Sequence, residues 1–412
     1  MALNAATVWE IRAAGSQANG GGFYDRSPGT SVDYSQQDAA QLTVTDLATD
    51  GAGTGLSSAT GGFTAAMVGN IIHITGGTLT AGWYEITAYT DTNTVTIDRS
   101  AGASKTGGTG NVGGAFLYGG SLDGEFALMQ VDGNKVWIKA GTYTQGESVT
   151  WAAASAATPQ IIEGYNTSRG DSPVGNNRPL IVCGENTLNF NSYAVVSNLR
   201  FTTTASSGVA GGIATVFFNC KAQNLSESAN RYAFNASNSY CSFIQCEAES
   251  TIGSGVVCGI ATQIAFCYIH DSSIGVYTNS AGVAVVGTVI DSCASSGLNI
   301  AGTGALGGLY INNTIYNCGN GIASKGAQSI VMNNIISGCT TGANWDTNVH
   351  NSGNIWDYNC FYNTTDRTNV TAGAHDIDAD PLLTDPSNGD FALSTGSPCF
   401  ASGMTLDASV GL

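Results

Sequence analysis

Short apolar segments of three to five residues, separated by Gly, Asn, Ser and Thr, follow one another from about residue 195 onward. Segments such as Ile274–Tyr277 and Ser296–Ile300 show no 3.6-residue helical period. The motif around Ile315 recurs at steps of 21 to 26 residues. We call its equivalent positions the anchors; they are Phe201, Ala222, Ala248, Ile269, Ile290, Ile315, Ile336 and Phe361. A repeat of about 23 residues, made of short strands and tight bends, predicts an all-β right-handed parallel β-helix.

Columns of like residues on successive repeats support this register. Two residues before the anchor, cysteine is followed by asparagine, at Cys220, Cys246, Cys267, Asn313, Asn334 and Asn359. Three residues after the anchor lie Thr204, Leu225, Thr251, Ser272, Cys293, Cys318, Cys339 and Thr364. Equivalent side chains of neighbouring turns lie about 4.8 Å apart, so amides can bond along the axis. We interpret these ladders as structural; metal or redox chemistry is the alternative for the cysteines.

The remaining chain divides into segments on either side of this repeat. Strands at 135–144, 159–165 and 179–183 extend the coil, glycine is expected at its bends, and a short helix at 121–131 is expected to cover its open end. The predicted organisation is 1–30, a first strand leading into the β-helix; 31–113, an inserted β module; 114–364, the β-helix with its capping helix; and 365–412, a C-terminal cap or tail.

The inserted module contains three recognisable strands, at 70–75, 83–89 and 94–98. They predict a small antiparallel unit, and a lone hairpin of this size is marginally stable in water. The module is therefore a candidate docking or assembly piece. Its apolar residues are expected at or near an interface, namely Ile72, Ile74, Trp83, Tyr84 and Ile86.

Three stretches of the chain resemble a known superfamily. The segments 136–144, 14–22 and 379–403 are similar to the opening and closing segments of right-handed parallel β-helix proteins of the pectate-lyase-like superfamily. The segments 20–25 and 33–41 resemble openings found in β-helix proteins encoded by bacteriophages. The first resemblance implies the fold, whereas the family spans enzymes, adhesins and structural proteins. The second implies a virion protein.

Composition and charge narrow the function classes. The net charge of −17 argues against nucleic-acid binding, because phosphate contacts need Lys and Arg. No apolar run is long enough for a membrane span, and the first residues lack the basic and apolar regions of a signal peptide. Eleven cysteines without Cys-x-x-Cys or zinc spacing predict mostly buried, reduced thiols in a chain folded in the host cytoplasm.

One outward column of the predicted coil carries candidate chemistry. Glu249, His270 and Asp291 follow their anchors on successive turns, and Glu247 and Tyr268 share the same face. Glu249 and Asp291 are two turns apart, roughly 9.6 Å, near the carboxylate separation of inverting glycosidases. The alternative is an ordinary solvated sheet face. The stretch 375–380 has metal-like composition but is interpreted as a structural turn, and no metal or cofactor is expected.

These observations lead to two principal hypotheses. The first is a non-enzymatic virion component that decorates a capsid or forms part of a tail, spike or fibre, with other virion proteins and copies of itself as partners. The second is a virion spike that binds or cleaves a host glycan with the acidic column. A secreted cellular enzyme is a third option. Polyuronate lyase chemistry lacks its acidic calcium cluster and would bring an acidic polymer to an acidic protein.

Overall fold

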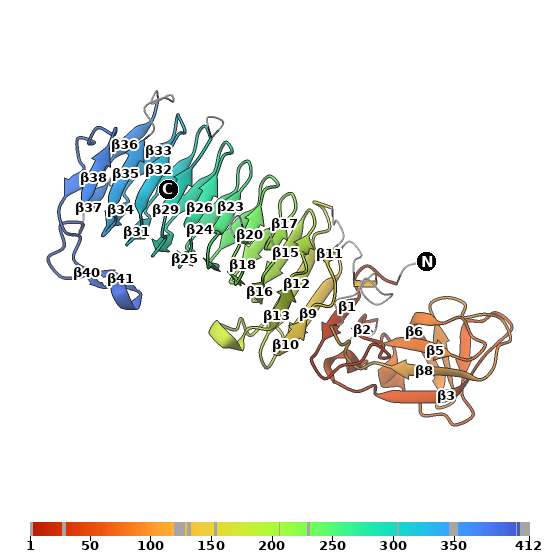
Figure 1. Ribbon diagram of the computed structural model, residues 1–412. Helices are drawn as coiled ribbons and strands as arrows, with labels where there is room; N and C mark the ends of the chain where they lie inside the picture. The colour runs from red at the N-terminus through yellow and green to blue at the C-terminus, as the bar shows by residue number, and fades with distance from the viewer. Residues whose placement is uncertain are drawn as a thin grey trace, which may run out of the picture. The chain divides into compact units, whose positions relative to one another are not determined.

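The computed structural model describes residues 3–26, 30–118, 128–129, 133–151, 155–205, 207–228, 231–302, 305–345, 353–400 and 402–403. The protein is all-β, with a parallel β-solenoid of about ten turns and a small closed antiparallel barrel near the N-terminus (Figure 1). This confirms the predicted fold class. The chain forms two compact units, Met1–Val182 with Ala194–Leu199, and Cys183–Tyr193 with Arg200–Leu412. No helix in the described ranges is long and apolar enough to cross a membrane.

In the first unit, the N-terminal strand forms a rung of the solenoid. β1 pairs in parallel with β9, and β9 pairs in parallel with β12. The solenoid strands that begin in this unit are β1 (Val8–Ile11), β2 (Gly22–Phe23), β9 (Lys135–Lys139), β10 (Thr142–Thr144), β11 (Val149–Trp151), β12 (Gln160–Tyr165), β13 (Leu180–Gly184) and β15 (Ala194–Ser197). Short 3-10 turns lie at Tyr34–Gln36, Ala65–Met67 and Gly175–Asn177. The predicted helix at 121–131 lies outside the described residues except for Leu128 and Met129, which are helical.

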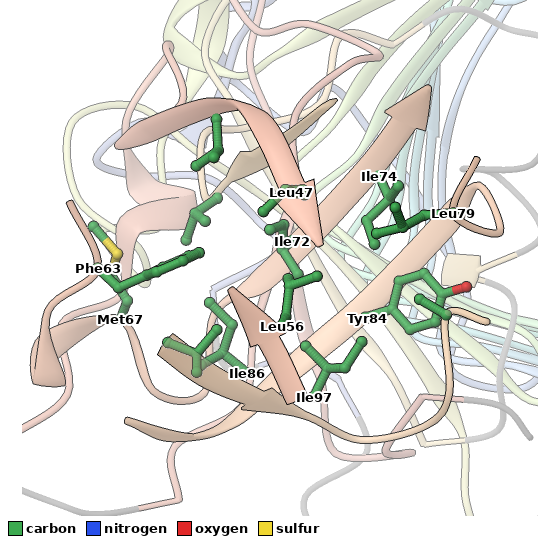
Figure 2. Close-up of a cluster of buried hydrophobic side chains, with 14 residues drawn as sticks. Leu47, Leu56, Phe63, Met67, Ile72, Ile74, Leu79, Tyr84, Ile86 and Ile97 are labelled. Carbon is green, nitrogen blue, oxygen red and sulfur yellow. The ribbon is translucent and has the colours of Figure 1, made fainter. Parts of the chain in front are cut away.

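The inserted segment of the first unit is a six-stranded closed barrel. Its strands, in the order β3-β4-β7-β6-β5-β8, are β3 (Leu42–Thr49), β4 (Gly55–Ser57), β5 (Ile71–Gly76), β6 (Gly82–Asp91), β7 (Thr94–Ile97) and β8 (Gly108–Val112). The three sequence-predicted strands correspond to β5, β6 and β7. Residues such as Leu47, Leu56, Phe63 and Met67 fill the centre (Figure 2).

The barrel corrects the interface prediction for its apolar residues. Ile72, Ile74, Tyr84 and Ile86 point into the barrel and are buried in its own core (Figure 2). A closed barrel with a filled centre has no free sheet edge, so it needs no partner surface to hold these side chains. Trp83 instead stacks on His73, with ring centroids 3.8 Å apart, and meets the edge of Phe116.

A buried charge network lies beside β1 in the same unit. Glu10 is fully buried and receives the guanidinium groups of Arg12, at 2.8 Å, and Arg169, at 2.7 Å. The Tyr165 hydroxyl also donates to the Glu10 carboxylate. Arg169 additionally reaches Asp33 at 2.7 Å, in the segment that precedes the barrel. A buried carboxylate requires such partners, because an isolated charge is strongly destabilising there.

The second unit contains the regular part of the solenoid, with three strands in each turn (Figure 1). Its first sheet comprises β18 (Val216–Phe218), β21 (Ser242–Ile244), β24 (Gln263–Ala265), β27 (Ala284–Val286), β30 (Leu309–Ile311), β33 (Ile330–Met332) and β36 (Ile355–Asp357). Its second sheet comprises β16 (Arg200–Thr203), β19 (Lys221–Asn224), β22 (Glu247–Ser250), β25 (Tyr268–His270), β28 (Val289–Asp291), β31 (Thr314–Tyr316), β34 (Ile335–Ser337), β37 (Cys360–Tyr362) and β39 (Ile377–Asp378). Its third sheet comprises β14 (Leu188–Phe190), β17 (Val209–Gly211), β20 (Tyr232–Ala236), β23 (Ser254–Cys258), β26 (Ile274–Thr278), β29 (Ser296–Ile300), β32 (Asn320–Ser324), β35 (Thr341–Trp345) and β38 (Thr365–Thr368).

The sequence-predicted anchors pair with one another along the second sheet. Each anchor is the Cα partner of the next, from Phe201 with Ala222 through Ile315 with Ile336 to Ile336 with Phe361. All eight anchors are buried. The predicted register is therefore confirmed, and the residues on either side of each anchor point outward because side chains alternate along a strand.

A column of hydrogen bonds holds the bend between the first and second sheets. The backbone N–H of each turn donates to a side chain of the next turn: Thr288 N to Asn313 Oδ1 at 3.0 Å, Asn313 N to Asn334 Oδ1 at 3.0 Å, and Asn334 N to Asn359 Oδ1 at 3.1 Å. The Nδ2 of Asn313 also donates to Asn334 Oδ1, and that of Asn334 to Asn359 Oδ1. Asp376 ends the column by accepting from Asn359 N at 2.8 Å.

Glycines with left-handed φ occur at many bends of the described chain, as expected, but they are rare at this one. The residues with left-handed φ at this bend in the second unit are Asn219, Gln245, Phe266, Gly287, Asn312, Asn333 and Tyr358. Only one of these is glycine. A left-handed non-glycine residue costs about 1–2 kcal/mol, so the neighbouring column must supply the compensating stabilisation.

The predicted column of residues three positions after each anchor is wrong in its early turns. Ser272, Cys293, Cys318 and Cys339 are buried as neighbours, but Leu225 is 48% exposed. Strands β16, β19 and β22 run one residue further, so the buried positions there are Thr203, Asn224 and Ser250. The ladder therefore moves by one residue where the second-sheet strands shorten.

The C-terminal segment does more than the predicted cap. β38 pairs with β35 and β39 pairs with β37, so the solenoid sheets continue past residue 364. Beyond them, β40 (Leu383–Asp385) and β41 (Asp390–Leu393) form an antiparallel hairpin around a 3-10 turn at Pro386–Asn388. Phe391 of this hairpin contacts Tyr268 and Tyr316, so the segment runs back along the outward face of the second sheet.

The bend column generates a stability prediction. Replacing Asn334 with Ala leaves the Asn313 N–H and the Tyr310 carbonyl without their side-chain partner. Because each buried polar group left unsatisfied costs roughly 1–3 kcal/mol, we expect the free energy of unfolding to fall by about 3 kcal/mol or more.

Chemical denaturation of Asn334→Ala, compared with Asn344→Ala, measures this loss. Asn344 is a half-buried amide on the third sheet with one 3.3 Å side-chain contact, so its removal should cost less than about 1 kcal/mol. Equal effects of the two substitutions would contradict the structural role of the column.

Candidate functional site

The outward face of β19, β22, β25, β28 and β31 carries the candidate residues. Ala248, Ile269 and Ile290 point into the core, and the residues before and after them point outward. The Cα register aligns Lys221, Glu247 and Tyr268 in one column. It aligns Gln223, Glu249, His270, Asp291 and Tyr316 in the neighbouring column. The five sequence-predicted residues therefore share this face.

Glu247 lies at the centre of an ion-pair cluster. The Lys221 ammonium contacts Glu247 Oε1 at 2.6 Å, and His270 Nε2 lies 3.2 Å from the same oxygen. The other ring nitrogen, His270 Nδ1, lies 2.8 Å from a carboxylate oxygen of Asp271. With a carboxylate at each nitrogen, the imidazole is held in a fixed orientation.

Tyr268 and Asp291 form the other half of the cluster. The Tyr268 ring stacks on the His270 ring with centroids 4.3 Å apart, and its hydroxyl reaches Asp291 Oδ2 at 3.4 Å. Ser292 donates to the second Asp291 oxygen at 2.9 Å. Asp291 and His270 are each only 9% exposed, although they occupy outward positions.

Glu249 is the least constrained acid of the sequence-predicted set. Gln223 donates to Glu249 Oε1 at 2.9 Å, and the Lys221 ammonium is 4.0 Å from Glu249 Oε2. β25 separates β22 from β28, so Glu249 and Asp291 stand two strand spacings apart, roughly 9.6 Å. His270 occupies the position between them in this column.

The surroundings push the pKa values of the acids in opposite directions. The hydrogen bond from His270, together with Lys221, lowers the pKa of Glu247 to about 2. Burial raises the pKa of Asp291 above its ordinary value, against the opposing hydrogen bond from Ser292. Burial would lower the pKa of His270, but its hydrogen bonds to Glu247 and Asp271 outweigh it, and the net shift is upward. Glu247 is therefore the stronger acid of the two, and Asp291 holds its proton more readily.

Sequence reasoning missed the residues that border this cluster. Lys221 is the Cα partner of Glu247, so the same register argument could have found it. Phe391 could not be found this way, since it comes from the C-terminal hairpin and lies with its ring 6.3 Å from Tyr268 and 5.9 Å from Tyr316. Beside it, a cavity of about 270 Å³ separates the hairpin from the sheet; its lining includes Tyr316, Tyr362, Asp380, Pro381 and Leu383.

The metal-like stretch at 375–380 serves structure. His375 Nδ1 lies 2.8 Å from Asp357 Oδ2, Asp376 ends the asparagine column, and Arg367 pairs with Asp376 at 3.0 Å and Asp378 at 2.7 Å. In the described part of the chain, no group of three or more His, Cys, Asp and Glu side chains is arranged to hold a metal ion.

Two adjoining cavities lie along the third sheet. One, of about 200 Å³, is lined by Trp345 and Trp356, and the other, of about 340 Å³, by Asn299, Asn344 and Trp345. The Trp345 indole N–H is buried and has no hydrogen-bond partner among the described residues. These cavities contain none of the acidic residues of the second sheet.

Comparison with known proteins gives similarity of fold. No protein-family model matches this sequence, and no curated protein matches it. Among solved structures, pectate lyase Pel9A is 13% identical with a TM-score of 0.47, over 68% of this chain and 86% of that one. The A-module of Azotobacter vinelandii mannuronan C-5 epimerase AlgE4 is 14% identical with a TM-score of 0.39, over 64% and 96%. The Dettilon tailspike protein is 11% identical with a TM-score of 0.33, over 63% and 58%. At these values no activity is transferred to this chain.

The His270 interactions generate a pH prediction. A His pKa raised in the folded state gives stabilisation that is complete below the ordinary value of about 6.5 and is lost as pH rises through the folded pKa. His270→Gln should therefore reduce the unfolding free energy most at acidic pH, with a smaller difference from wild type above neutrality.

Urea unfolding at about pH 5.5 and about pH 8.5 measures this difference. His375→Gln is the matched control, because its imidazole pairs with Asp357 away from the acidic cluster. A wild-type-to-variant difference that stays constant across this range would contradict the ion pair.

Proposed function

We propose that this protein is a β-solenoid component of a bacteriophage particle that holds a host glycan along the acidic face of its second sheet and cleaves it. The observation that carries the proposal is the pairing of Asp291, with a raised pKa, and the nearby carboxylates Glu247 and Glu249 on one face. The phage setting is supported by the sequence resemblance of the N-terminal segments.

The two roles of a glycosidase can be assigned within this face. Asp291 is the general acid, because its burial favours the protonated form that donates to the leaving oxygen. Glu249 is the general base that activates water, since the separation of roughly 9.6 Å from Asp291 suits inversion. Glu247 and Lys221 hold His270 in place, and Tyr268 orients Asp291 through its hydroxyl.

The charge of the face selects the substrate class. Four carboxylates, Glu247, Glu249, Asp271 and Asp291, surround a single lysine and one histidine. A polyuronate would be repelled, whereas a neutral or amino sugar would not. The Tyr316 and Phe391 rings offer apolar surface for sugar faces beside the acids.

The catalytic assignment predicts separate effects on turnover and binding. Asp291→Asn and Glu249→Gln should each lower the cleavage rate of a neutral bacterial surface polysaccharide about 10²–10⁴-fold, with binding retained. Activity should also fall as pH rises, because Asp291 must be protonated.

Release of reducing ends, and oligosaccharide binding by calorimetry, measure the two effects. Tyr277→Ala, on the third sheet, is the control for an outward aromatic residue away from the site. If the wild-type protein binds the polysaccharide but does not cleave it, the catalytic assignment is wrong and the protein is a glycan-binding spike. If it neither binds nor cleaves the polysaccharide, the glycan function is wrong and only the structural role stands.

A second candidate function, assembly through self-association, is favoured by an exposed apolar ridge. Ile213, Tyr240, Ile260 and Leu306 are 40 to 59% exposed at the corner between the third and first sheets. Backbone hydrogen bonds between neighbouring turns, such as Tyr240 N to Ile260 O at 2.8 Å, line up this corner. A row of exposed apolar side chains is typical of an association surface.

The ridge predicts a change of oligomeric state without loss of stability. The double substitution Ile213→Ser, Ile260→Ser should weaken self-association at least tenfold, because each buried isoleucine contributes about 1.5 kcal/mol or more. Light scattering during size-exclusion chromatography measures it. Val174→Ser is the control, since this side chain is 67% exposed and lies next to a 3-10 turn of the first unit. A wild-type monomer at high concentration would contradict the assembly role.

A further inference from the structure

The C-terminal segment brings two cysteines together from distant positions. Cys360 begins β37, and its thiol donates to the carbonyl of Ala379, at 3.3 Å. Ser397 Oγ donates to the carbonyl of Pro381 at 2.6 Å and accepts the backbone N–H of Cys399 at 3.1 Å. Cys399 is thereby bound through Ser397 to the segment 379–381, whose Ala379 carbonyl accepts a hydrogen bond from the Cys360 thiol.

Cys399 differs from the other ten cysteines, all of which are buried. Cys399 is half-buried, whereas Cys360 is buried. The hydrogen bond with the Cys360 thiol lowers the pKa of Cys399 to about 7 and raises that of Cys360. An accessible thiol with a lowered pKa beside a protonated one is the arrangement of an attacking and a resolving cysteine.

We propose that Cys360 and Cys399 are a redox pair whose disulfide fastens the C-terminal segment 379–400 to β37. The Cys399 thiolate attacks a low-molecular-weight disulfide such as oxidised glutathione, forms a mixed disulfide and releases one reduced glutathione as thiolate. Cys360 then loses its proton to solvent and attacks the Cys399 sulfur, which releases the second glutathione. Two protein thiols are oxidised, and one glutathione disulfide is reduced.

The disulfide would hold the C-terminal segment in place beside the acidic residues of the second sheet. The fastened segment contains Phe391, whose ring contacts Tyr268 and Tyr316. It also forms one side of the cavity between Pro381 and Tyr362. A chain folded with reduced thiols would form the Cys360–Cys399 disulfide on reaching an oxidising environment. The inference does not depend on glycan cleavage, because neither cysteine belongs to the proposed catalytic residues Asp291 and Glu249.

Equilibration of the full-length protein with oxidised and reduced glutathione tests the proposal. We expect a species lighter by two hydrogen atoms, and a non-reduced digest in which the peptides of Cys360 and Cys399 are joined. Before oxidation, brief alkylation near neutral pH should label Cys399 first. Cys399→Ser should abolish the joined peptide, whereas Cys183→Ser, at a buried thiol of the first turns, should leave it unchanged.

Limited proteolysis provides the second readout. The segment 379–400 should be cut more slowly in the oxidised wild type than in the reduced wild type, and Cys399→Ser should show no such difference. Three results would overturn the proposal: free thiols at both positions in an excess of oxidised glutathione, a stable mixed disulfide at Cys399, or a cross-link only between two copies of the chain.

Discussion

The regular part of the structure depends on one interaction, the hydrogen bond from a backbone N–H in one turn to the side chain at the same bend of the next turn. Asn313, Asn334 and Asn359 each accept such a bond and donate from Nδ2 to a carbonyl of an earlier turn. A bend without this column would leave buried polar groups unsatisfied next to a left-handed residue. The column therefore fixes where β28, β31, β34 and β37 begin.

The start of each strand decides which side chains face outward. A shift of one residue would place Glu247, Glu249 and Asp291 in the core, where unpaired charges are not tolerated. Because the repeat is visible in the sequence, the anchors and the shared face of these acids could be predicted. The early turns were misplaced at Leu225, since nothing in the sequence marks the strands that run one residue longer. Phe391 was missed because the repeat does not describe the segment that folds back.

In the barrel, by contrast, the local sequence was too weak a signal to predict every strand. β8 (Gly108–Val112) contains two glycines, a residue type that is depleted in strands. In the structure, a Cβ on Gly108 would lie 2.9 Å from Leu79 Cδ1, and one on Gly110 would lie 2.9 Å from Leu47 Cδ1. The glycines thus allow the close approach that completes the barrel, and this requirement appears only when β3 and β5 are in place on either side of β8.

The placement of charge gives the strongest reason to treat the acidic face as a site. Charged residues make up only 10% of the chain, yet several of them lie in two partly buried networks. The network around Glu10 joins β1 to the segment before the barrel, and this structural role accounts for its buried charges. The network around Glu247 joins strands that the core already holds in register, and burial within it raises the pKa of Asp291. Backbone pairing and apolar anchors would keep these strands together without it. The fold therefore keeps Asp291 desolvated and Glu247 ionised within one cluster, and this difference in proton affinity is the observation on which the proposed role of Asp291 as a general acid rests.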